Sequence, residues 1–110
     1  MAVTNLAELD ALVARVKEAQ REFASFSQEQ VDKVFRAAAL AASNARIPLA
    51  QMAVAESGMG IIEDKVIKNH FASEYIYNAY KDEKTCGILS QDDEMGTMII
   101  AEPVGIICGI

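Results

Sequence analysis

The sequence predicts an α/β fold in which four helices precede a short stretch of sheet. Over the first 80 residues, apolar side chains recur every three or four positions, which is typical of amphipathic helices. The last 16 residues are apolar and rich in β-branched side chains, which is typical of strands. The chain is 52% hydrophobic and 24% charged, a balance that suits a globular protein and argues against disorder.

The first helix is expected over residues 5–24. Asn5 and Glu8 have the spacing of a capping box, and Thr4 is an alternative cap. The apolar stripe repeats at three and four residues: Leu6, Leu9, Val13, Val16 and Phe23.

A second capping box, Ser27 with Gln30, opens a helix that is expected to end at residues 43–44. Its alanine-rich run, residues 37–42, combines high helix propensity with little side-chain bulk. These small residues permit close packing against a neighbouring element.

The third helix is expected over residues 48–56. Pro48 suits its first turn, where the missing N–H would have no partner in any case. Gly58 is the expected left-handed residue that terminates it.

The fourth helix is expected from residue 63 to about residue 80, with residues 81–94 as a connector. Glu63 and Asp64 favour the positive end of its dipole. Its tyrosines occupy more than one face, which favours contact with a second subunit or domain: Tyr75, Tyr77 and Tyr80.

The carboxyl-terminal stretch predicts two extended segments, residues 95–103 and residues 104–110. The second has almost no polar side chain, which is typical of a strand covered on both faces of a parallel sheet. Such a strand at the end of a chain leaves an unpaired hydrophobic edge. The sequence therefore predicts an incomplete domain, cut where its central sheet begins.

Composition excludes several classes of partner. Lys plus Arg number 10 and Asp plus Glu number 16, which gives a net charge of −6 without any basic cluster. Nucleic acid and anionic membrane surfaces are therefore not expected partners. No apolar run reaches the roughly 18 residues of a spanning helix, and no secretory signal is visible. Two cysteines without metal-binding spacing suggest a cytoplasmic protein with reduced thiols.

The stretch from Gly58 to Glu63 begins like a dinucleotide-binding fingerprint. Glu63 stands where the last glycine should be, and the stretch follows a predicted helix instead of a strand. A turn between helices is therefore the favoured interpretation. Glu56 and Glu63 flank this turn and could in principle do acid–base work, but helix-end electrostatics explains them more simply.

His70 is the single histidine, and no nucleophile or set of metal ligands accompanies it in sequence. A histidine on a helix, paired with Glu74 one turn later, is the favoured interpretation.

Cys86 lies near Lys81 and Lys84, whose charges could lower the pKa of a thiol and make it reactive. Two neighbouring acids offset those charges, and no general base is in view. Cys86 is therefore not favoured as a nucleophile, and Cys108 is expected to be a small buried hydrophobic residue.

Several stretches resemble the amino-terminal part of the aldehyde dehydrogenase superfamily: residues 55–58, the helix with Lys65 and Asn69, and residues 101–110. Residues 64–78 and 81–86 are similar to the CoA-acylating acetaldehyde dehydrogenase half of bacterial bifunctional aldehyde-alcohol dehydrogenases. The resemblance runs along essentially all 110 residues.

The resemblance implies a place for each part of the chain. The helices would pack against a Rossmann-type cofactor domain, and residues 97–103 would extend toward a partner subunit. Residues 104–110 would form the first cofactor-domain strand, which makes Ile110 the candidate cofactor-binding residue. The catalytic residues would lie elsewhere, with the nucleophilic cysteine beyond residue 110, and no metal site is expected.

The implied activity is the fermentative conversion of acetaldehyde, CoA and NAD to acetyl-CoA and NADH. Iron would belong to a separate alcohol dehydrogenase half, the parent would be a homo-oligomer, and this chain alone would be inactive. The alternative is a free-standing helical interaction module, with the tyrosine-bearing helix as its contact face.

Overall fold

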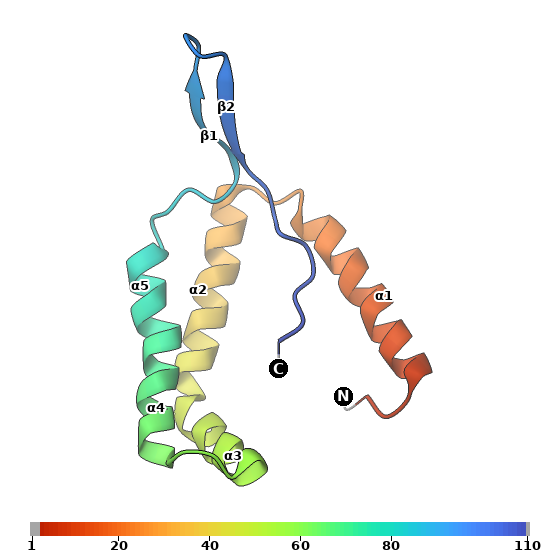
Figure 1. Ribbon diagram of the computed structural model, residues 1–110, viewed down its shortest axis with the longest axis vertical. Helices are drawn as coiled ribbons and strands as arrows, with labels where there is room; N and C mark the ends of the chain where they lie inside the picture. Colours follow the sequence, from red (N-terminus) through yellow and green to blue (C-terminus); the bar gives the residue numbers. More distant parts are fainter. Residues whose placement is uncertain (1–2, 110) are drawn as a thin grey trace. The chain divides into compact units, whose positions relative to one another are not determined.

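The computed structural model describes residues 3–109, and Figure 1 shows the order of the elements along the chain. The helices and strands are α1 (Leu6–Phe23), α2 (Gln28–Asn44), α3 (Arg46–Ser57), α4 (Ile62–His70), the π-helical segment η1 (Phe71–Tyr75), α5 (Ile76–Tyr80), β1 (Gly87–Asp92) and β2 (Thr97–Ala101). These elements form two compact units: the residues up to Gln28 with those from Lys84 onward, and Glu29–Glu83.

The predicted cap of the first helix is confirmed. The Asn5 side-chain oxygen accepts a hydrogen bond of 2.9 Å from the Glu8 backbone N–H. In return, the Glu8 carboxylate accepts the backbone N–H and the hydroxyl of Thr4, each at 2.8 Å. These bonds, first from the Thr4 backbone and then from its hydroxyl, lower the pKa of Glu8. In a capping box the Glu8 side chain would accept the backbone N–H of the cap residue Asn5. Here it accepts the N–H of Thr4, one residue earlier.

In the unit Glu29–Glu83, α2 runs beside the continuous helix that α4, η1 and α5 form together (Figure 1). Phe35 of α2 meets Tyr77 of α5 edge to face, with ring centroids 5.1 Å apart. Near them, the alanine-rich face of α2 leaves a hollow of about 270 Å³ beside Ala72 and Ser73. α3 packs on α4, and Ala50 of α3 is the one fully buried hydrophobic residue among those described.

The turn between α3 and α4 has the geometry expected of its glycines. Gly58 has φ of 65° and donates its N–H to the Val54 carbonyl at 2.8 Å, so it terminates α3 as predicted. α4 then begins with Glu63 and Asp64 in its first turn. The stretch is therefore a helix-to-helix turn.

The helix that α4 opens contains a π-helical turn, which the sequence did not predict. The Ile76 N–H reaches back five residues to the Phe71 carbonyl. Ser73, only 6% exposed, donates its hydroxyl to the Asn69 carbonyl at 2.7 Å. This bond adds a side-chain donor to a backbone carbonyl of the turn that precedes the π-helical segment.

The strands form an antiparallel hairpin, and here one prediction was wrong. Residues 81–94 were expected to be a connector, yet Gly87–Asp92 forms β1 and pairs with β2. Its sequence carries no β-branched alternation, so the strand depends on pairing with β2. The register slips by one residue at Leu89, which is a β-bulge. Asp92 accepts the Met95 N–H at 2.9 Å and closes the turn.

The extended segment predicted over residues 95–103 contains the strand β2, whereas residues 104–109 have no regular secondary structure. A strand exists only when another strand satisfies its N–H and C=O groups, and the pairing of β2 with β1 ends at Ala101. The strand predicted over residues 104–110 therefore has no partner within the described part of the chain. Cys108 is exposed instead of buried for the same reason.

Candidate functional site

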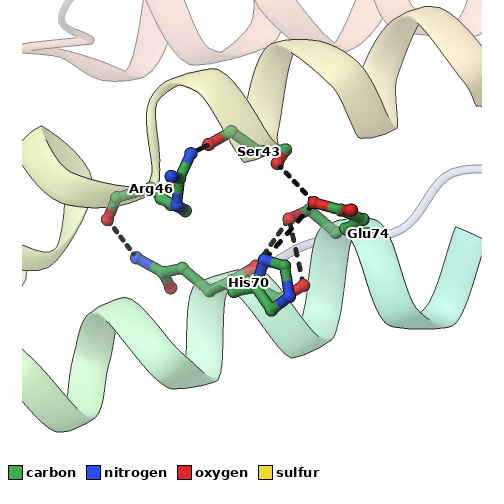
Figure 2. A network of polar contacts seen from close by, with 6 residues as sticks. Ser43, Arg46, His70 and Glu74 are labelled. Atoms are coloured by element: carbon green, nitrogen blue, oxygen red, sulfur yellow. Dashed lines mark hydrogen bonds and ion pairs between the residues drawn. The ribbon is translucent and has the colours of Figure 1, made fainter.

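A network of polar side chains lies where α2, α3 and α4 meet (Figure 2). We name it the junction cluster, and its members are Ser43, Arg46, Asn69, His70, Ser73 and Glu74. Ser43 lies at the end of α2 and Arg46 at the start of α3, while the others come from α4 and η1. Residues 31 and 23 positions apart in sequence are thus joined through hydrogen bonds, Ser43 to Glu74 and Asn69 to Arg46.

Two bonds hold the end of α2 and the start of α3 in place. Arg46 Nη1 donates to the Ser43 carbonyl at 2.8 Å, which satisfies one of the free carbonyls at the end of α2. The Asn69 amide donates to the Arg46 carbonyl at 3.0 Å. The Arg46 guanidinium therefore has a defined position beside the helix end, as Figure 2 shows.

Glu74 is the acceptor shared by two members of the cluster, Ser43 and His70. Its Oε2 lies 3.4 Å from Ser43 Oγ and 3.4 Å from His70 Nδ1. The pairing of His70 with Glu74 one turn later is therefore confirmed. Both side chains are about half exposed, at 49% and 54%, so the pair contributes little to stability.

The cluster opens into a hollow of about 390 Å³ between α2 and the π-helical turn. We name it the junction hollow, and its lining residues are Arg36, Ala39, Leu40, Ser43, Asn44, Arg46, Glu74 and Tyr77. Two arginines and one carboxylate give its wall a net positive charge in a chain whose net charge is −6.

The junction cluster does not have the geometry of a nucleophilic triad. In such a triad the histidine lies between the hydroxyl and the carboxylate. Here the carboxylate of Glu74 lies between Ser43 and His70, so the imidazole does not face the Ser43 hydroxyl. The cluster can bind and orient a polar group, and it lacks the hydroxyl–imidazole–carboxylate order of a triad.

Cys86 is held at its backbone, and within residues 3–109 its thiol has no hydrogen bond to a base. The side-chain oxygen of Gln28 accepts the N–H groups of Thr85 at 2.7 Å and Cys86 at 3.1 Å. The Gln28 amide nitrogen donates to the Thr85 hydroxyl at 2.9 Å. The Cys86 sulfur lies 4.0 Å from that hydroxyl, which is no general base. That Cys86 is not the nucleophile therefore stays a prediction.

The other candidates from the sequence do not converge on a site. Glu56 is exposed, and Glu63 lies in the first turn of α4. Ile110, the candidate cofactor-binding residue, lies outside the described residues. Within the described range 3–109, no cluster of three metal-ligating side chains occurs, and no helix is long and apolar enough to cross a membrane.

Ser43 and Arg46 were not predicted from the sequence as members of a site. The one feature that could have marked them is their position, since both flank the predicted boundary between the second and third helices. A polar residue at a helix end is ordinarily a cap, so the signal is weak.

Comparison with known proteins decides the family. The chain is 84% identical, over all 110 residues, to the bifunctional aldehyde-alcohol dehydrogenase of Escherichia coli K12. A solved structure, a probable aldehyde dehydrogenase from Listeria monocytogenes EGD-e, matches 84% of the chain with a TM-score of 0.77 and 47% identity. The chain matches a segment of the aldehyde dehydrogenases.

Among these aldehyde dehydrogenases is also the acetylating succinate-semialdehyde dehydrogenase of Clostridium kluyveri, 35% identical over 105 residues, which are 96% of this chain. The chain spans only 12% of the E. coli relative, 23% of the Clostridium relative and 20% of the Listeria structure. No family model matches the chain. Because they match the Listeria structure, the helices and the hairpin are part of the α/β fold of an aldehyde dehydrogenase, as the sequence predicted.

Proposed function

We propose that the chain serves as the amino-terminal segment of an NAD-dependent, CoA-acylating acetaldehyde dehydrogenase. The parent enzyme would convert acetaldehyde, CoA and NAD to acetyl-CoA and NADH. The observation that carries this proposal is the 84% identity, without a break in coverage, to a bifunctional aldehyde-alcohol dehydrogenase. The match to a dehydrogenase described as acetylating supports the acyl-transfer half of the reaction.

The catalytic nucleophile would be a cysteine outside these residues. Acylating chemistry of this kind needs a thiolate that attacks the aldehyde carbon and later passes the acyl group to CoA. Cys86 lacks a base and Cys108 is an exposed residue in an irregular segment, so neither has the surroundings of an activated thiol. The segment by itself would be inactive, and its role would be to support the cofactor domain.

Residues 104–110 would supply the first strand of that cofactor domain, with Ile110 close to NAD. Their apolar sequence suits a strand buried on both faces, and residues 104–109 have no pairing partner among the described residues, which leaves them available for one. NAD would accept the hydride in the parent enzyme. The parent would be a cytoplasmic homo-oligomer with iron in a separate alcohol dehydrogenase half.

A hybrid enzyme tests the proposal. In it, this chain replaces the matching segment of the E. coli relative, which is 84% identical. We expect CoA-dependent formation of NADH from acetaldehyde at a rate comparable to that of the parent. A folded hybrid without this activity would contradict the proposal and favour a free-standing interaction module.

Cysteine variants of the hybrid test the position of the nucleophile. Cys86→Ala and Cys108→Ala should each retain acyl transfer, because neither sulfur has an activating partner. Loss of acetyl-CoA formation in a correctly folded Cys86→Ala hybrid would place the nucleophile within this chain.

A further inference from the structure

We propose that the junction hollow is a binding site for a small organic acid. This inference does not depend on the chemistry of the catalytic centre, since the hollow lies wholly within the unit Glu29–Glu83. Its volume of about 390 Å³ lies within the range of small-molecule sites, which is roughly 300–1,000 Å³.

The charge of the lining favours a carboxylate. Arg36 and Arg46 both line the hollow, and a guanidinium presents a planar fork of N–H donors that matches the two oxygens of a carboxylate. Arg46 uses one of its nitrogens on the Ser43 carbonyl and keeps its other donors. Arg36 has no hydrogen bond or ion pair within the described residues.

The remaining walls favour an organic body over a bare inorganic anion. Ala39 and Leu40 supply apolar surface on the α2 side, and Leu40 is 59% exposed. Glu74 and the Tyr77 ring complete the lining on the other side. A hydroxyl on the ligand would find an acceptor in Glu74, whose carboxylate would repel a second negative group placed beside it.

The hollow is also built before any ligand arrives. Ser43, Arg46 and Glu74 belong both to its lining and to the junction cluster, so hydrogen bonds between segments hold the walls. The π-helical turn carries Glu74 into the wall, and such turns occur frequently at functional sites. Preorganised donors bind a ligand with a smaller entropic loss.

Three probes with the same four-carbon chain separate the contribution of the carboxylates from that of a hydroxyl. Succinate has carboxylates alone, L-malate adds a hydroxyl, and butane-1,4-diol has no carboxylate. Binding is measured by isothermal titration on the 110-residue chain and on the hybrid enzyme. We expect L-malate to bind at least as tightly as succinate, and the diol not to bind.

Variants locate the site. Arg36→Ala and Arg46→Gln should each weaken succinate binding by about ten-fold, since each removes a charge-assisted hydrogen bond. Glu74→Gln should strengthen it by about three-fold by removing a like charge. The matched control is Arg15→Ala in α1, which removes an exposed arginine far from the lining residues in sequence and should change nothing.

Three results would overturn the inference. One is the absence of saturable succinate binding in both proteins. A second is binding that Arg36→Ala and Arg46→Gln leave unchanged. The third is binding to the isolated chain that disappears in an active hybrid, because the hollow would then receive a carboxylate of the remaining polypeptide. Activity of the hybrid is measured separately, so failure here is distinct from failure of the proposed function.

Discussion

The helices of residues 29–83 and the extended segment of residues 84–109 differ in where their stabilising partners lie. The helices satisfy their own backbone groups, and rings such as Phe35 and Tyr77 find each other within the unit. The hairpin has only one paired edge on each strand, and every side chain of β1 is exposed. Ile99 and Ile100 of β2 are 60% and 52% exposed. An isolated two-stranded hairpin is marginally stable at best in water.

Local sequence signals therefore suffice to predict the helices of residues 29–83, and they do not suffice to predict the extended segment of residues 84–109. The difference between the two regions also indicates where substitutions should act, and four predictions sharpen it, from the largest expected effect to the smallest.

Tyr77→Ala should destabilise the helical unit by about 2–3 kcal/mol, because it removes a large ring that packs against Phe35. Urea unfolding followed by circular dichroism at 222 nm measures the change. The matched control is Tyr80→Ala, whose side chain is 56% exposed and should matter little. Equal effects of the two substitutions would show that the Phe35–Tyr77 contact does not hold the helices together.

Gln28→Leu should loosen the start of the hairpin by about 1–3 kcal/mol, since Thr85 and Cys86 lose their hydrogen-bond partner. Amide hydrogen exchange at Thr85 and Cys86 should accelerate, while exchange in α4 stays unchanged. Gln51→Leu in α3, at an exposed glutamine, provides the control. Unchanged exchange at Thr85 in the Gln28→Leu variant would show that Gln28 does not hold the start of the hairpin.

Gly58→Ala should destabilise the turn after α3 by about 1–2 kcal/mol, because φ of 65° is unfavourable for a residue with a Cβ. No atom lies within 4 Å of the added Cβ, so the effect is conformational and not steric. Gly58→Asn should lose less, since asparagine tolerates this region better. If urea unfolding ranked asparagine below alanine, the explanation would be wrong.

Acid should weaken the cap of α1, and this is the smallest effect. The folded-state pKa of Glu8 is lowered from 4.5, so its contribution is fully present above about pH 4.5 and is lost as the pH falls through the lowered value. The helicity of α1 between pH 7 and pH 3 should therefore decline more in the native chain than in Glu8→Gln. Identical profiles would show that the Thr4 bonds do not stabilise the folded state.

Local chemistry explains why the helices were predictable. The cap at Asn5, the terminator at Gly58 and the acids at the start of α4 are all signals written within a few residues. The π-helical turn was not predictable, because it depends on the hydrogen bonds that Ser73 and its neighbours make in the folded helix. The strand β1 was missed because its sequence is unremarkable without its partner.

The candidate site was less predictable than the fold. The pair of His70 with Glu74 follows from their spacing on one helix. The contacts of Ser43 and Arg46 with that helix join residues from separate segments, and no periodic pattern records them. The expected burial of Cys108 failed because burial needs covering elements that the described residues do not supply.

Hydrogen exchange at residues 104–109 tests the central claim most directly, namely that this segment completes its sheet with the rest of an aldehyde dehydrogenase. The measurement compares the 110-residue chain with the hybrid enzyme. We predict rapid exchange at these amides in the chain alone and slow exchange in the hybrid, with residues 29–83 showing a smaller difference. Equally rapid exchange at residues 104–109 in both proteins would contradict the account.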